Sequence, residues 1–116
     1  MTEKEKYLGE FEQMILLAVL RLDHQAYGTT IRQLLAQEIN RDVTIGALYT
    51  TLDRLEKKGL VTSTLGEATN ERGGRAKKYF QVSAEGQRAL KRSKDALNNL
   101  WQGIALSQAG ERYEPI

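Results

Sequence analysis

Apolar residues recur at three- and four-residue steps in three successive stretches of this chain, a spacing that collects them on one face of an α-helix. We expect helices over about residues 9–22, 28–39 and 45–58. Polar residues separate these stretches over 23–26 and again over 40–43. The first half of the chain is therefore predicted to form three helices joined by short turns.

The predicted third helix carries capping residues at both ends. Thr44 can accept a hydrogen bond from a free backbone N–H at the start. Gly59 can adopt the left-handed conformation that ends a helix, and Lys57 and Lys58 suit the negative end of the helix dipole. At about 100° per residue, the face predicted to be buried consists of Ile45, Leu48, Leu52 and Leu55.

After Gly59 the period of the pattern falls from about 3.6 residues to about 2. Residues 60–65 and 78–83 are rich in β-branched and aromatic side chains, which favour strands. The segment between them contains Gly73 and Gly74. This pattern predicts a two-stranded hairpin with a long tip.

A fourth helix is predicted after the hairpin. Ser83 and Ala84 open a helix-start sequence, and Leu90, Leu97 and Ile104 follow at seven-residue steps. A helix with one narrow apolar seam usually needs a partner helix. We therefore expect a dimerisation helix over 84–106 and a frayed tail over 107–116.

Three helices, a hairpin and one long helix predict an α+β, mostly α-helical fold. The order is that of a winged helix-turn-helix domain, over residues 1–83, with the two-stranded hairpin as its wing. In such domains the helix after the turn enters the major groove of DNA, and the wing reaches the adjacent backbone or minor groove.

The outward face of the third helix and the hairpin tip carry residue types that contact double-stranded DNA. Small residues at the helix start allow close approach to base edges, while hydroxyl and basic groups bind bases or phosphates. The ring of Tyr49 can pack on the core while its hydroxyl points at a phosphate. The predicted DNA-binding residues are Thr44, Gly46, Ala47, Tyr49, Thr50, Arg54, Lys57, Arg72, Gly73, Gly74, Arg75 and Lys77, with Thr51 as a further hydroxyl.

Charge distribution supports this interpretation more than composition does. The chain has 116 residues, 41% of them hydrophobic and 28% charged, and a net charge of only +2. Residues 72–78, however, hold four basic groups and no acidic one, the pattern expected of a nucleic-acid contact. A solvated helix face or a solvated basic loop explains either feature alone. Both together, in this order, favour DNA binding.

Membrane and secretory classes are disfavoured by the sequence. There are no cysteines, the longest apolar run covers residues 14–20, and the charged N-terminus lacks the apolar core of a signal peptide. These features exclude a disulfide framework and a cysteine-based zinc finger, and they predict a cytoplasmic protein without a membrane partner.

An ordered set of short motifs resembles the PadR-like transcriptional regulators. The resemblance spans about residues 8–103 and implies a homodimeric repressor of the short form, with a single C-terminal helix. It is carried by Leu16-Leu17, Tyr27-Gly28, Gly46-Ala47-Leu48-Tyr49, Leu52, Arg54, Leu55, Lys58-Gly59-Leu60-Val61, Arg72-Gly73-Gly74-Arg75, Lys78-Tyr79-Phe80 and Glu85-Gly86.

Trp101 on the seam of the last helix has two interpretations. It can be dimer core, or it can line a pocket between subunits that stacks flat aromatic ligands, as the multidrug-binding branch of PadR-like proteins does. In the second case a small aromatic effector releases the repressor from DNA. The predicted dimer or ligand groove contains Tyr7, Phe11, Met14, Leu90, Leu97, Leu100, Trp101 and Ile104.

The sequence contains no recognisable catalytic motif. The single histidine, His24, and its neighbour Asp23 lack the further ligands of a metal site, and no Ser-His-acid set or nucleotide-binding loop is present. We expect no enzyme, no cofactor and no metal. Two alternatives stay open: a winged-helix protein-interaction module, and a ligand-binding dimer without specific DNA binding.

Overall fold

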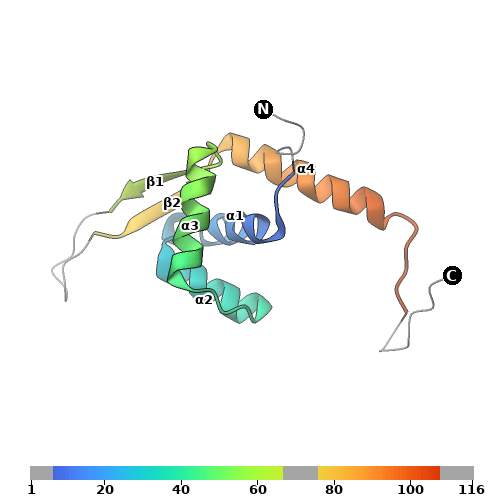
Figure 1. Cartoon of the computed structure of the whole chain (residues 1–116), viewed down its shortest axis with the longest axis horizontal. Helices are drawn as coiled ribbons and strands as arrows, with labels where there is room; N and C mark the ends of the chain where they lie inside the picture. Colours follow the sequence, from blue (N-terminus) through green and yellow to red (C-terminus); the bar gives the residue numbers. More distant parts are fainter. Residues whose placement is uncertain (1–6, 67–75, 108–116) are drawn as a thin grey trace.

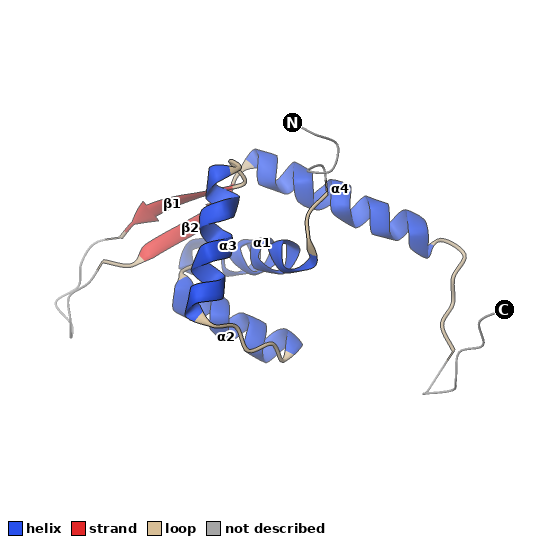
Figure 2. Cartoon of the chain, viewed as in Figure 1, coloured by secondary structure: helices blue, strands red, loops and turns tan. Residues whose placement is uncertain are grey.

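The computed structural model describes residues 7–66 and 76–107, and over these residues it has the predicted order of elements (Figures 1 and 2). Three helices are followed by an antiparallel hairpin and a long helix. The elements are α1 (Glu10–Leu22), the 3₁₀ turn η2 (Asp23–Gln25), α2 (Gly28–Ile39), α3 (Ile45–Lys57), β1 (Val61–Leu65), β2 (Lys78–Val82) and α4 (Ala84–Trp101).

The core lies where α1, α2 and α3 meet and where the hairpin packs on them. Its fully buried side chains contribute roughly 1.5–3 kcal/mol each relative to an exposed position. The largest of them are Ile15, Leu16, Ile31, Leu48, Leu52 and Leu55, together with Val19 and Val61. The predicted winged helix-turn-helix fold is confirmed, and its core is supplied mainly by the three predicted helical faces.

Two predictions about α3 are wrong. Ile45, predicted to be buried, is 49% exposed, because it is the first helical residue and precedes the turn that packs on the core. Val43, in the connection before it, is buried instead. Thr51, predicted to point outward, is buried because it lies three residues after Leu48 and four before Leu55, on the same helical face.

The hairpin is attached to the helical body along β2. β1 and β2 pair antiparallel, with Val61 opposite Val82. The N–H of Phe80 donates to the carbonyl of Ala26 at 2.9 Å, and Tyr27 forms an isolated bridge with Tyr79. The connection between α1 and α2 therefore runs beside β2 and fixes the base of the hairpin.

The start of α4 is fixed to the turn between α3 and β1. Ser83 accepts a hydrogen bond from the N–H of Gly86 at 3.0 Å, and its hydroxyl donates to the carbonyl of Gly59 at 2.6 Å. A Cβ at position 86 would collide with the carbonyl of Leu60, so this close approach requires glycine. The N–H of Leu8 donates to the buried Ser93 hydroxyl at 2.9 Å, which ties α4 to the segment before α1.

The predicted extent of the last helix is too long. α4 ends at Trp101, not at residue 106, and Gly103 has a positive φ of 78°. Residues 104–107 lie outside regular secondary structure and are exposed, so no packing against the described body favours further helix there. Of the predicted frayed tail, 107–116, all but Ser107 lies outside the described residues.

Candidate nucleic-acid interface

The N-terminal turn of α3 presents a small, exposed and hydroxyl-bearing surface. Thr44 caps the helix, its hydroxyl accepting from the N–H of Ala47 at 3.1 Å. Gly46, Ala47 and Thr50 are exposed, and no described atom lies within 4 Å of a Cβ built at position 46. No described segment therefore covers this start of the predicted DNA-contacting face.

Tyr49 lies on the flank of α3, as predicted, but its hydroxyl has a neighbour that the sequence did not indicate. Its ring is tilted against Phe80, with centroids 6.3 Å apart. The hydroxyl lies so close to Gly28, the first residue of α2, that a Cβ there would overlap it. The glycine of the Tyr27-Gly28 motif thus makes room for the tyrosine of the α3 motif.

The basic residues of α3 are divided between two environments. Lys57 is exposed and has no ion-pair partner among the described residues. Arg54 and Lys58 instead face Glu12 of α1, with Arg54 Nε 3.7 Å and Lys58 Nζ 3.2 Å from Glu12 Oε2. The predicted phosphate contact at Arg54 therefore has an acidic side chain beside it.

Glu12 is a residue that sequence reasoning missed. Its other oxygen, Oε1, accepts a hydrogen bond from the N–H of Gly9 at 2.9 Å, and its side chain is only 12% exposed. Burial by itself raises the pKa of Glu12. The Gly9 hydrogen bond and the charges of Lys58 and Arg54 lower the pKa more, so it lies below its ordinary value. The helix-start position of Glu12 was visible in the sequence, but its partners, more than 40 residues away, were not.

The described base of the hairpin holds one of the predicted basic contacts in place. Lys77 Nζ lies 4.5 Å from the centroid of the Tyr27 ring and 3.5 Å from its hydroxyl. The Tyr27 ring meets the Tyr79 ring edge-on, with centroids 5.3 Å apart. Lys78 turns to the body instead, with Nζ 4.0 Å from Glu56 Oε1 of α3. The predicted tip contacts Arg72, Gly73, Gly74 and Arg75 lie outside the described residues.

Comparison with known proteins decides the family. The family described as "Transcriptional regulator PadR-like family" matches residues 16–92, which is more than half of the chain. The chain belongs to the PadR-like family. It is a DNA-binding transcriptional regulator and not an enzyme. The predicted resemblance is confirmed.

Solved structures agree with this membership. A PadR-like transcription factor from Bacteroides fragilis is 27% identical, with 84% of this chain and 87% of that one covered and a TM-score of 0.66. A PadR-like transcriptional regulator from Bacillus cereus is 25% identical, with 81% and 93% covered and a TM-score of 0.61. A Streptococcus transcriptional regulator at 22% identity shares the fold, with 88% and 93% covered and a TM-score of 0.65. A search of curated proteins finds no match.

In this PadR-like chain a groove lies beside α4, and the α1 residues that line it differ from the predicted ones. The groove of about 570 Å³ between α1 and α4 is lined on the α4 side by the predicted Leu90, Leu97 and Trp101 and by five polar or charged residues of the same helix. Its α1 side is formed by Gln13, Leu17 and Leu20, which the prediction left out.

Phe11 and Met14, assigned to this groove from the sequence, lie elsewhere. The guanidinium of Arg41, in the connection between α2 and α3, lies over the Phe11 ring, 5.2 Å from its centroid. Met14 lines a separate hollow with Leu34 and Leu35 of α2. Within a single copy these two side chains therefore lie away from the groove beside α4. Because α1 is apolar around most of its circumference, periodicity could not say which face meets which neighbour.

The end of α4 and the residues after it form an exposed apolar surface, here called the α4 apolar end. It projects away from the helical body, at the opposite end of the molecule from the hairpin (Figure 1). Tyr7, also assigned to the groove, is exposed near the other end of the described chain. The α4 apolar end consists of Leu97, Leu100, Trp101, Ile104 and Leu106.

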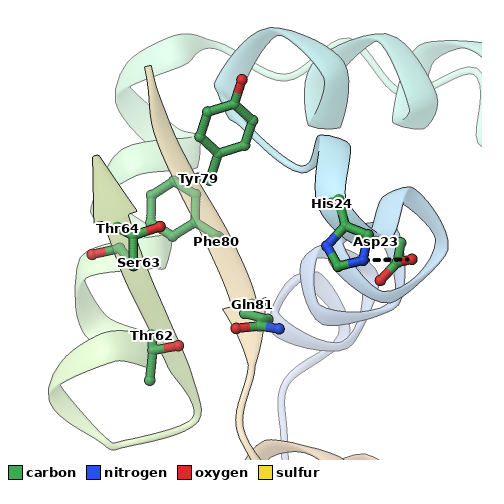
Figure 3. A pocket seen from close by; sticks show the side chains of 8 residues that line it. All are labelled: Asp23, His24, Thr62, Ser63, Thr64, Tyr79, Phe80 and Gln81. Carbon is green, nitrogen blue, oxygen red and sulfur yellow. Dashed lines mark ion pairs between the residues drawn. The ribbon is translucent and has the colours of Figure 1, made fainter. Parts of the chain in front are cut away.

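His24 and Asp23 line a shallow hollow of about 270 Å³ on the outer face of the hairpin, with Thr62, Tyr79 and Gln81 (Figure 3). His24 Nε2 lies 3.6 Å from Asp23 Oδ2, and both side chains are largely exposed. Among the described residues no group of three or more His, Cys, Asp or Glu could hold a metal ion. No helix in the described part of the chain is long and apolar enough to cross a membrane.

Proposed function

We propose that this PadR-like regulator is a cytoplasmic, homodimeric, sequence-specific repressor that occludes a promoter, and that a small aromatic ligand releases it. The observation that carries the proposal is the exposed outer face of α3 beside a basic hairpin. That face begins with small and hydroxyl-bearing residues, which suit the major groove, and continues into basic residues, which suit phosphates.

The proposed contacts divide by type. Gly46, Ala47 and Thr50 approach base edges at the start of α3, and Thr44 and Tyr49 contact the flanking backbone. Arg54, Lys57 and Lys77 contact phosphates and contribute affinity that depends on salt. The tip residues Arg72, Gly73, Gly74 and Arg75 are assigned to the same backbone from the sequence.

The proposed dimer uses the α4 apolar end. Its five large hydrophobic side chains are each at least half exposed in a single copy, and an exposed apolar cluster of this kind is typical of a protein interface. A second copy supplies a chemically matching surface, since a two-fold interface is self-complementary. The two α3 helices would then enter major grooves about 34–36 Å apart.

The proposed effector site is the groove between α1 and α4, completed by the second copy. Trp101 is 52% exposed and lies at this groove and at the α4 apolar end. A half-exposed indole can stack on a flat aromatic ring. Because Trp101 is the only tryptophan, quenching of its fluorescence by planar aromatic compounds measures binding directly. Ligand release of DNA would be checked by adding the same compound to the bound operator.

Selection of genomic DNA fragments by the purified protein, followed by sequencing, tests the main proposal. We expect enriched fragments to share two half-sites about one helical turn apart. Affinity for them should fall steeply between 50 and 200 mM salt, since roughly 6–10 neutralised phosphates lower it about 10³–10⁵-fold. Weak binding that is indifferent to salt, with no enriched fragment, would instead favour a winged-helix protein-interaction module.

A further inference from the structure

Two of the three basic residues at the C-terminal end of α3, Arg54 and Lys58, form a stripe with proposed base-contacting residues. Gly46, Thr50, Arg54 and Lys58 are spaced by four residues, and such residues lie on one side of a helix. The stripe therefore starts with small, uncharged residues and ends with two cations. Glu12 of α1 lies beside those two cations.

Glu12 holds these cations with a well-fixed carboxylate. One oxygen accepts from the Gly9 N–H at the start of α1, which fixes the side chain to its own helix. The other oxygen contacts Lys58 at 3.2 Å and Arg54 at 3.7 Å. The carboxylate is only 12% exposed, so water screens these pairs less than it screens a pair on the open surface.

The cations themselves stay accessible. The side chains of Arg54 and Lys58 are 52% and 38% exposed, so a phosphate can reach them. A phosphate that does so must compete with the Glu12 carboxylate for the Lys58 ammonium and for the Nε edge of the Arg54 guanidinium. Lys57, without an ion-pair partner among the described residues, meets no such competition.

We propose that Glu12 is a specificity-determining positioning residue, which withdraws Arg54 and Lys58 from non-specific phosphate contacts. This inference rests on the proposed DNA-binding function. Loose encounters with any duplex leave the Glu12 pairs intact. Only a duplex that seats α3 fully in the major groove brings phosphates close enough to displace the carboxylate, so the two cations contribute mainly to operator binding. Glu12 thereby increases the ratio of operator affinity to non-specific affinity.

Replacing Glu12 by glutamine tests the proposal, because glutamine can still accept from the Gly9 N–H but loses the charge. Affinity for the selected operator and for an unrelated duplex of equal length is measured over a salt series. In E12Q we expect non-specific affinity to rise roughly three- to tenfold, and its salt slope to steepen by about one to two, at about 0.9 for each added phosphate contact. The operator affinity should change less, so the specificity ratio falls.

E10Q is the matched control. Glu10 also lies in the first turn of α1 and is ion-paired, but its partner is Arg41, at 3.6 Å, and not a residue of α3. E10Q should keep the wild-type salt slope and specificity ratio. The same salt slope and specificity ratio in E12Q and E10Q would refute the proposal. Equal losses of operator and non-specific affinity in E12Q would also refute it, because they indicate that Glu12 has only a structural role.

A second variant tests the same point without altering Glu12. In R54Q/K58Q the two cations are absent, and we expect the non-specific salt slope to change by less than one. A loss of about two would show that both cations were already free to bind any duplex, and would overturn the proposal. Wild-type protein that binds neither duplex would refute the regulator function and this inference with it, whereas wild-type binding with an unchanged E12Q refutes the inference alone.

Discussion

At the scale of single residues, two glycines and one glutamate fix how neighbouring elements meet. Gly28 leaves room for the Tyr49 hydroxyl, and Gly86 allows α4 to start against the carbonyl of Leu60. Glu12 joins the start of α1 to the end of α3 through Lys58. Each of these roles depends on a neighbour distant in sequence, so none could be assigned from the local pattern.

Gly28→Ala should destabilise the protein by about 1–3 kcal/mol, because the added methyl overlaps the Tyr49 hydroxyl and the neighbourhood must shift. Removing that oxygen with Y49F should restore part of the loss in the double variant. Urea unfolding measures both effects. Gly46→Ala is the control for folding, since no described atom lies within 4 Å of its Cβ. A G28A midpoint equal to that of wild type would contradict the close contact.

The stability that Glu12 provides should depend on pH. Its pKa in the folded protein is below the ordinary value of 4.5, which we take for the unfolded chain. The folded state therefore favours the ionised form. This contribution is present above the unfolded pKa and is lost as pH falls through the folded pKa. The difference in unfolding free energy between wild type and E12Q should be constant from pH 7 to pH 5 and should shrink below about pH 4.5. A difference that persists unchanged at pH 3 would be inconsistent with the lowered pKa.

At the scale of elements, the order and bounds of the helices follow from periodicity, while their relative faces do not. The pattern predicted α2 over 28–39 and α3 over 45–58, and the structure has Gly28–Ile39 and Ile45–Lys57. It did not indicate which side of α1 meets which neighbour, because the neighbouring elements decide which side is covered. α4 ends before the predicted residue 106, because a heptad pattern shows which side of a helix is apolar and not where the helix stops.

Lys57→Ala should weaken binding to all duplexes by a similar factor and make the salt slope shallower by about one, because an exposed lysine contacts a phosphate and not a base. Thr50→Ala should instead lower operator affinity while leaving non-specific affinity unchanged. Binding titrations over a salt series separate the two. Arg88→Ala on α4, where Arg88 pairs with Glu85, is the charge-matched control. An operator-selective loss in K57A would show that the two roles are assigned the wrong way round.

At the scale of the whole molecule, the proposed DNA-contacting parts and the α4 apolar end lie far apart. The hairpin extends at one end, and α4 leads away from the body at the other (Figure 1). The long axis of the molecule measures 62 Å, against 22 Å for the short one. An elongated copy with an apolar end is suited to pairing with a second copy while both α3 helices stay exposed.

Leu100→Glu should convert the proposed dimer to a monomer without unfolding it, because Leu100 is 72% exposed in the single copy and its charge would be buried only in the dimer. Sedimentation equilibrium gives the mass, and thermal melting reports folding. Leu65→Glu on β1 is a close control, since Leu65 is 73% exposed and lies on the hairpin. A monomeric wild type, or an L100E variant that stays dimeric, would place the interface elsewhere.

The sequence by itself determined the fold, the order of elements, the family and the types of residue on the outer face of α3. It could do so because helix and strand periods, caps and turn residues are local properties of the chain. Only the tertiary structure decided that Glu12 meets Arg54 and Lys58, that Tyr49 lies over Gly28, and that Leu17 and Leu20, not Phe11 and Met14, line the groove beside α4. These contacts depend on how helices pack across the core, and a helix such as α1, with apolar residues around most of its circumference, is compatible with several packings.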